Sequence, residues 1–173
     1  ADAPLSIVHG KPLSEESGLG TLTMSGWFRE ITGTHREREA LVFYENGSVT
    51  RWSYQELAER ANEVARALLA CGVSKGTRIG VLMTNRPEFL SSVFGISLAG
   101  GVATTLSTFS TPAELDHLLQ LSGISILLME RNVLNKDFGA ILAELEPQFA
   151  QEVESELNSL RFPYLRHVAA ING

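Results

Sequence analysis

The same three-part pattern occurs twice between Thr77 and Met129: an apolar run, a helix cap and an amphipathic helix. In each copy a short polar residue stands three positions before a glutamate, so the two can cap the first helical turn reciprocally. The copies are Arg78–Met83 with Asn85 and Glu88, and Gly100–Leu106 with Thr111 and Glu114. A third apolar run, Ile124–Met129, follows, and His167–Ile171 predicts a last strand. This alternation predicts an α/β fold: a doubly wound, mostly parallel sheet flanked by helices.

Element boundaries follow from the same patterns. We expect strands at 78–83, 101–106, 124–129 and 167–171, covered by helices at 53–71, 86–99 and 112–122. An N-terminal β-hairpin is expected around Asn46-Gly47, a pair that tolerates the positive φ angles of a type I′ turn. Residues 133–160 are expected to be helical, with a break at Pro147.

Further signals mark the ends of the long helix expected at 53–71. Ser53 and Glu56 form another capping box, and Gly72 is expected to end the helix as a left-handed residue. Residues 1–20 lack periodicity and are interpreted as an N-terminal arm. We therefore expect one arm, 1–20, and one α/β subdomain, 21–173.

Composition limits the possible partners and compartment. The chain has 173 residues, of which 44% are hydrophobic and 20% charged, as in a soluble globular domain. Its net charge of −6 argues against nucleic acid or an anionic membrane surface as a partner. No apolar run reaches the roughly 18 residues of a transmembrane segment. A single cysteine, Cys71, and no secretory signal favour the cytoplasm.

Three motifs resemble catalytic or metal-binding patterns without matching them. Gly95–Ala99 nearly spells the nucleophile elbow of a hydrolase, but Ser97 is expected inside a helix, where small residues would let the helix pack closely on the sheet. The four histidines have no metal-ligand spacing, so no metal site is expected. Arg78 and Arg86 flank the first strand; they could attract a phosphate, although a solvated charge or pairing with a helix glutamate is favoured.

The stretch from about residue 22 to residue 130 resembles the front portion of the adenylate-forming (AMP-binding) enzymes. These include acyl-CoA synthetases, which are acid–CoA ligases, peptide-synthetase adenylation domains and luciferases. The order and spacing of several segments carry this resemblance, which returns at Leu165–Val168. The segments are Ala40–Phe43, Trp52–Leu57, Glu59–Val73, Lys75–Met83, Asn85–Phe89, Leu98–Val102 and Thr111–Leu115.

The resemblance implies a parent enzyme that activates a carboxylic acid, fatty or aryl, with ATP and Mg²⁺ to an acyl-adenylate. It would then transfer the acyl group to CoA. The family grips phosphate with a Ser/Thr/Gly-rich loop ending in lysine, and also uses an aromatic-Gly-x-Thr-Glu segment, an aspartate and a lysine of a mobile C-terminal domain. We find none of these in the sequence. In the family the phosphate loop follows the strand that Val168–Ile171 resembles.

We therefore expect an incomplete N-terminal fragment whose partner is the remainder of the same polypeptide. It should be inactive alone, contain no catalytic residue and bind none of these cofactors by itself. A stand-alone doubly wound α/β binding or interaction domain is the alternative.

The resemblance also implies a weak site for the nucleotide end of CoA. In some acyl-CoA synthetases the loop after the second strand contacts CoA, and a basic residue beyond the next strand reaches its phosphate. The matching positions here are Leu106, Ser107 and Thr108, with Lys136 or Arg131 as the basic residue. Such positions lie near the carboxyl ends of strands, where ligands bind in doubly wound sheets. That they are ordinary loop residues remains the alternative.

Overall fold

The computed structural model of the protein describes residues 10, 12–15, 23–150 and 156–171. Most of the arm expected at 1–20 therefore lies outside the described residues, and Leu13–Glu15 form a short 3₁₀ turn, η1, within it. Among the described residues, no helix combines the length and apolar character that a bilayer span requires.

The central element is a four-stranded parallel sheet with the order β4-β3-β5-β8. Its strands are β3 (Arg78–Leu82), β4 (Val102–Thr105), β5 (Ile126–Glu130) and β8 (His167–Ile171). The chain leaves β3 toward β4 on one side and returns to β5 on the other. The strand order thus reverses between β3 and β5, which confirms the doubly wound sheet expected from the sequence.

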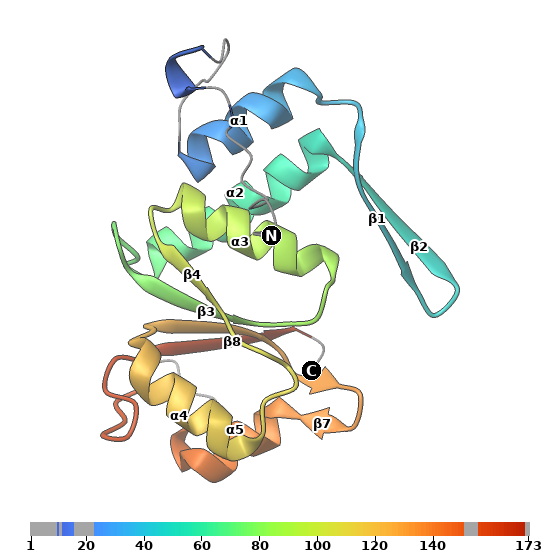
Figure 1. The fold of residues 1–173 in the computed structure, drawn as a ribbon. Helices are drawn as coiled ribbons and strands as arrows, with labels where there is room; N and C mark the ends of the chain where they lie inside the picture. The colour runs from blue at the N-terminus through green and yellow to red at the C-terminus, as the bar shows by residue number, and fades with distance from the viewer. Residues whose placement is uncertain (1–9, 11, 16–22, 151–155, 172–173) are drawn as a thin grey trace, which may run out of the picture.

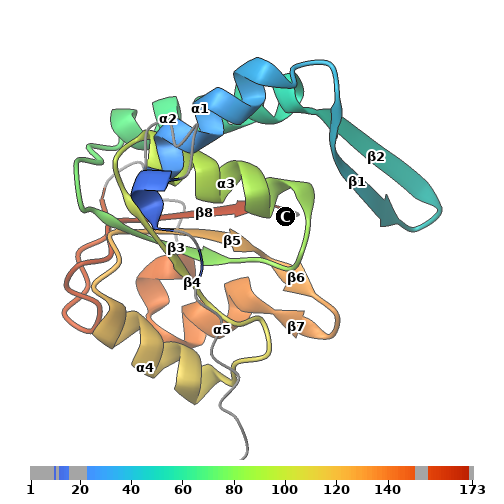
Figure 2. The ribbon, with the colours of Figure 1, turned by 45° about the horizontal axis from the view of Figure 1, so that its top comes forward.

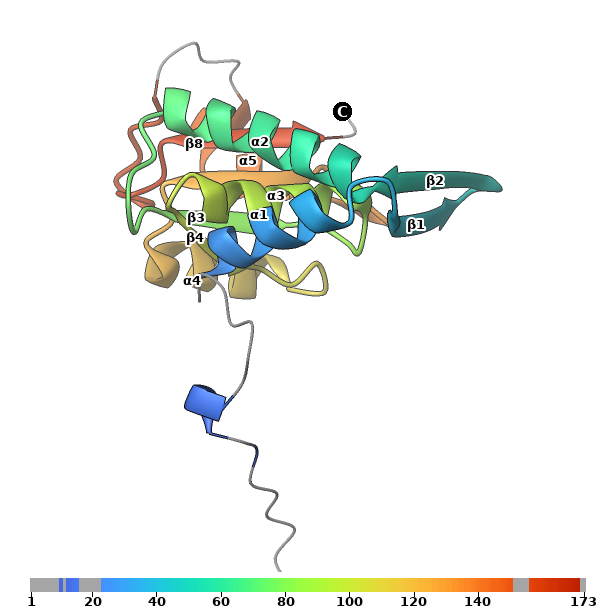
Figure 3. The ribbon, with the colours of Figure 1, turned by 90° about the horizontal axis from the view of Figure 1, so that it is seen from above.

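Helices cover both faces of this sheet (Figure 1). The helices are α1 (Met24–Thr34), α2 (Tyr54–Ala70), α3 (Pro87–Leu98), α4 (Pro112–Ser122) and α5 (Phe138–Leu145). Figure 1 shows α2 and α3 above the sheet and α4 and α5 below it. Figure 3 shows α1 lying across α2 and α3, which makes it the outermost layer on that side.

Alternating side chains of each strand build two separate cores. Ile79 and Val81 pack with α2 and α3, whereas Leu82 of the same strand packs in the core that includes α4 and α5. All three are fully buried. A strand that is buried on both faces carries a continuous apolar run rather than an alternating one. This is why Arg78–Met83 is almost entirely apolar.

The expected hairpin is present as β1 (Glu39–Glu45) and β2 (Ser48–Ser53), which pair antiparallel. Its turn residues Asn46 and Gly47 have φ angles of 50° and 81°, as a type I′ turn requires. The hairpin extends away from the sheet and its helices (Figure 2). Its base is fixed by Trp52, which is buried with α1 and α2.

Two of the three predicted capping boxes are confirmed. Ser53 with Glu56 caps α2, and Thr111 with Glu114 caps α4; in each pair both reciprocal hydrogen bonds form. Gly72 has a φ of 79° and ends α2 as expected. The backbone N–H of the next residue returns to the last turn of the helix. These ends form locally because each needs only residues within about five positions.

The cap predicted from Asn85 and Glu88 is wrong. The N-cap residue of α3 is Arg86, which makes no side-chain cap bond, and Pro87 occupies the first helical position. The Glu88 carboxylate instead accepts a hydrogen bond from Arg86 Nε at 2.8 Å. A nearby guanidinium therefore takes the carboxylate that would have completed the box.

The helix predicted over 133–160 is also wrong in large part. The segment begins with a small hairpin, β6 (Asn132–Val133) and β7 (Lys136–Asp137), and only then forms α5. Asp137 caps α5 by accepting from the Ala140 N–H, which fixes its start. The helix ends at Leu145, Glu146 is its extended C-cap residue before Pro147, and the 3₁₀ turn η2 (Pro147–Ala150) follows. Residues 151–155 lie outside the described residues, and 156–160 are not helical.

The small residues of α3 pack differently from the expectation. A Cβ on Gly95 would lie 2.7 Å from Val64 and 2.8 Å from the carbonyl oxygen of Ala61, both on α2. Gly95 therefore permits the close approach of α2 and α3 rather than packing on the sheet. Ser97 lies in α3, away from any strand-to-helix turn, so no nucleophile elbow exists there.

Candidate functional site

Two groups of polar side chains lie beyond the carboxyl ends of the sheet strands. The first lies between β3 and β5, where the strand order reverses, and is called here the switch-point network: Thr84, Arg86, Glu88 and Glu130. The second lies beyond β4 and is called here the turn site: residues 106–110, Glu114, His117, Leu118 and Lys136. Ligands of doubly wound sheets bind in this general position, so both groups are candidates.

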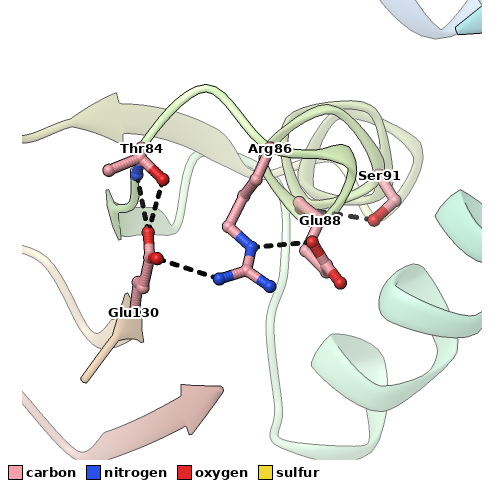
Figure 4. A network of polar contacts seen from close by, with 5 residues as sticks. All are labelled: Thr84, Arg86, Glu88, Ser91 and Glu130. Atoms are coloured by element: carbon pink, nitrogen blue, oxygen red, sulfur yellow. Dashed lines mark hydrogen bonds and ion pairs between the residues drawn. The ribbon is translucent and has the colours of Figure 1, made fainter. Parts of the chain in front are cut away.

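The switch-point network centres on the Arg86 guanidinium (Figure 4). Its Nη1 donates to Glu130 Oε1 at 2.9 Å, and its Nε donates to Glu88. Glu130 Oε2 accepts from both the backbone N–H and the hydroxyl of Thr84, at 3.0 and 2.6 Å. The side chains of Arg86 and Glu130 are each only 9% exposed. This ion pair therefore joins the start of α3 to the end of β5 almost out of contact with solvent.

The electrostatics of the network hold Arg86 in its charged form. Burial alone would lower the pKa of Arg86, but the bonds and charges of Glu88 and Glu130 outweigh this effect and raise it. For Glu88 the directions are reversed: burial would raise its pKa, but the hydrogen bond and charge of Arg86 lower it. Pairing of Arg86 with a helix glutamate is thus confirmed, and Glu130 is a second partner that the sequence analysis missed. Arg86 is already neutralised by two carboxylates, so it is a poor anchor for a phosphate.

Arg78 lies at the opposite, amino-terminal edge of the sheet. Its Nη1 donates to the carbonyl oxygen of Ser122 at the end of α4, at 3.5 Å. The two arginines that flank β3 in sequence therefore cannot act together on one ligand.

The turn site begins where β4 ends. Leu106 continues the strand ladder through its N–H to Val81, and its side chain is buried in the core, so only its backbone reaches this edge. Residues 107–110 then make a tight turn, in which the Ser110 N–H donates to the Ser107 carbonyl at 3.2 Å. The Phe109 N–H donates to Ser107 Oγ, also at 3.2 Å. The turn leaves the Phe109 ring 84% exposed.

Lys136, one of the two basic residues proposed from the sequence, lies against this turn. Its ammonium donates to the carbonyl oxygens of Thr108 and Ser110, at 3.0 and 2.9 Å. Arg131, the alternative basic residue, is half-exposed and pairs with Asp137 at 3.5 Å instead. Of the predicted residues, the structure thus brings Thr108 and Lys136 into direct contact and places Ser107 beside them.

An open hollow is lined by part of the turn and by the first turns of α4. Its lining residues are Ser107, Phe109, Ser110, Glu114, His117 and Leu118. Hydrogen bonds from the Thr111 N–H and hydroxyl lower the pKa of Glu114, and the charge of Lys136 adds a smaller effect. Phe109 and His117 were missed as site residues because an isolated aromatic or histidine carries no motif. Among the described residues, the hollow included, no group of three His, Cys, Asp or Glu side chains could hold a metal ion.

Comparison with known proteins places the chain in a family. The profile of the AMP-binding enzymes, described as "AMP-binding enzyme", matches residues 28–166. The chain belongs to the AMP-binding enzyme family. This confirms the relationship expected from the order of its sequence segments.

Relatives in this family are much longer than the chain. The acyl-CoA ligase sidI of Aspergillus fumigatus is 34% identical over 110 residues, which are 64% of this chain and 18% of that protein. The acyl-CoA ligase SID4 of Ajellomyces capsulatus is 29% identical over 171 residues, 98% of this chain and 26% of that protein. The chain therefore spans about a fifth to a quarter of these relatives.

The fold is also that of the family. A Mycobacterium tuberculosis fatty acyl CoA synthetase superimposes with a TM-score of 0.66 at 21% identity, over 86% of this chain and 26% of that one. At this identity the likeness concerns the fold alone. It agrees with the parallel sheet, its flanking helices and the N-terminal hairpin.

Proposed function

We propose that this chain is the N-terminal part of an AMP-forming acid–CoA ligase. The whole enzyme would activate a carboxylic acid, fatty or aryl, with ATP and Mg²⁺ and transfer the acyl group to CoA. The family match over residues 28–166 supports this proposal. The chain aligns with only 18% and 26% of the length of the two acyl-CoA ligases compared, which supports its being one part of a longer enzyme. The exposed free thiol of Cys71 fits a reducing compartment, so we assign the enzyme to the cytoplasm.

We further propose that the 173-residue chain alone does not form acyl-adenylates. Phosphoryl chemistry needs cations and N–H donors aimed at the reacting phosphate. Arg86, the buried cation nearest the strand reversal, is already bound to two carboxylates. Arg86 is therefore not available to a nucleoside triphosphate at this position.

The turn site is the position that we propose for the nucleotide end of CoA. An ammonium has three N–H donors, and Lys136 uses two of them on the turn. Ser107 contributes a hydroxyl at the exposed rim. We propose that Ser107, Thr108, the Leu106 backbone and Lys136 border CoA in the whole enzyme. CoA would supply the acyl-accepting thiol, and these residues would hold its far end.

The test of adenylation is acid-dependent exchange of labelled pyrophosphate into ATP. The purified 173-residue chain and the longer protein that contains it would be assayed in parallel with short, long and aromatic acids. We expect exchange only with the longer protein, since removing a single transition-state donor already costs roughly 10²–10³-fold in rate. Acid-dependent exchange by the short chain above the enzyme-free blank would disprove its inactivity. No exchange by the longer protein with any acid would favour the binding-domain alternative.

A further inference from the structure

The Lys136 ammonium bonds to the two carbonyl groups on either side of Phe109. Thr108 precedes and Ser110 follows this residue, and their oxygens lie 3.0 and 2.9 Å from Lys136 Nζ. Bonds from a charged donor are stronger than bonds between neutral groups. The backbone on both sides of the exposed ring is therefore held by one side chain from another segment of the chain.

The small hairpin that carries Lys136 is built to hold the ammonium in this position. Val133 pairs with Lys136 in the ladder, and the Val133 side chain is buried in the core. Phe138, directly after the hairpin, is completely buried. At the tip, Leu134 adopts a φ of 53°, a left-handed conformation that a leucine rarely takes. The buried side chains of Val133 and Phe138 hold the hairpin in place despite this strain.

The contacts also limit what else Lys136 can do. Lys136 is half-buried, and two of its three N–H donors bond to the turn, which leaves one donor for any other partner. Arg131, directly before the hairpin, is more exposed and contacts Asp137. The two cations therefore differ in environment, although sequence position alone made them equivalent candidates.

We propose that Lys136 is a positioning residue that holds the 107–110 turn in its binding conformation, rather than a direct ligand of a CoA phosphate. The role in CoA binding rests on the proposed function; the hold on the turn does not. Without Lys136, the turn would lose both charged contacts and keep two hydrogen bonds between its own residues, at 3.2 Å each. Its open conformations would become more populated, and a bound nucleotide would have to order the turn before contacting it.

The hold on the turn can be tested in the 173-residue chain by limited chymotrypsin digestion. Cleavage after Phe109 would be measured relative to cleavage after Tyr164, an exposed residue in the loop before β8. In Lys136→Met we expect this ratio to rise on the order of ten-fold, because proteolysis follows the population of open conformations. Lys136→Arg should restore most of the protection, since a guanidinium can also donate to two carbonyls.

Arg131→Met is the matched control for this digestion. It removes one positive charge from the same hairpin without touching the turn, so the cleavage ratio should stay at the wild-type value. An unchanged ratio in Lys136→Met, or an equal rise in Arg131→Met, would overturn the hold on the turn.

The second experiment separates positioning from phosphate contact in the longer enzyme. The Michaelis constants for CoA and for dephospho-CoA, which lacks the 3′-phosphate, would be measured at low and high salt. A positioning role predicts that Lys136→Met raises both constants by the same factor, with an unaltered salt dependence. A larger rise for CoA, or a weaker salt dependence, would identify a phosphate ligand and overturn the proposal. Two unchanged constants together with faster cleavage would overturn the CoA site and leave the hold on the turn intact.

Discussion

The two polar groups at the carboxyl edge of the sheet use cations in opposite ways. Between β3 and β5, the Arg86 guanidinium meets carboxylates, and the ion pair with Glu130 is almost completely buried. Beyond β4, the Lys136 ammonium meets neutral carbonyl oxygens, and the neighbouring Phe109 ring is 84% exposed. Arg86 is thus paired with two carboxylates and almost closed to solvent, whereas Lys136 bonds carbonyl oxygens of a turn that borders an open hollow.

This difference shows that strand order alone does not locate a ligand site. The reversal between β3 and β5 is where doubly wound sheets most often bind ligands. In this chain the position is filled by an internal carboxylate, Glu130, which takes the donors that an anionic ligand would need. The open position lies one strand away, beyond β4. The chemistry of the residues, rather than the topology, therefore decides which position is available.

The largest expected effect comes from opening the buried ion pair. Arg86→Met should destabilise the protein by about 3 kcal/mol, because it leaves the Glu130 carboxylate buried without a counter-charge. The measurement is the midpoint of chemical denaturation. Arg51→Met, the same substitution in the exposed pair with Glu39, is the control and should leave the midpoint close to wild type. If the denaturation midpoint shifts equally in both variants, the buried pair of Arg86 and the exposed pair of Arg51 do not differ in their contribution to stability.

A smaller effect is expected at the helix cap beside the hollow. Thr111→Ala removes the hydroxyl that accepts the Glu114 N–H and should cost about 1 kcal/mol in unfolding free energy. Thr111→Ser keeps the acceptor and serves as the control. If denaturation curves of the alanine and serine variants coincide, the cap does not contribute to stability.

The difference in unfolding free energy between the wild-type protein and Arg86→Met should depend on pH. Burial would raise the pKa of Glu88, but Arg86 lowers it below the ordinary value of 4.5 in the folded protein. A lowered folded-state pKa contributes stability that is present above the ordinary value and lost as the pH falls through the folded-state pKa. The stability gap between wild type and Arg86→Met should therefore narrow below about pH 4.5. Because Glu88 is 42% exposed, the change should be modest. A gap that widens in acid would refute this assignment.

The smallest effect on stability is expected at the open site itself. Phe109→Ser should change the unfolding free energy by less than about 0.5 kcal/mol, because the ring buries little area in the fold. Phe138→Ser, two residues beyond Lys136 and fully buried, is the contrasting variant and should be severely destabilised. A large loss of stability in Phe109→Ser would show that the ring packs against the protein after all.

Local patterns in the sequence predicted most of the fold. The strand and helix alternation, the hairpin at Asn46-Gly47, the capping boxes at Ser53 and Thr111 and the helix end at Gly72 are all present. Each depends on residues a few positions apart, which interact as soon as the local backbone forms. The segment 133–160 was predicted poorly, because its hairpin is stabilised by contacts with distant residues, such as those of Lys136 with the 107–110 turn.

The sequence by itself therefore determined most of the elements and their ends outside segment 133–160, and it named Leu106–Thr108 with Lys136 or Arg131 as a candidate site. Only the tertiary structure decided which charges meet. Glu130 reaches Arg86 across 44 positions and Thr84 across 46, and Lys136 reaches the turn across 26 and 28. These pairings depend on the order β4-β3-β5-β8, which brings the strand ends together. That order is selected by the packing of two cores on the faces of the sheet, a property of the whole chain that no short pattern contains.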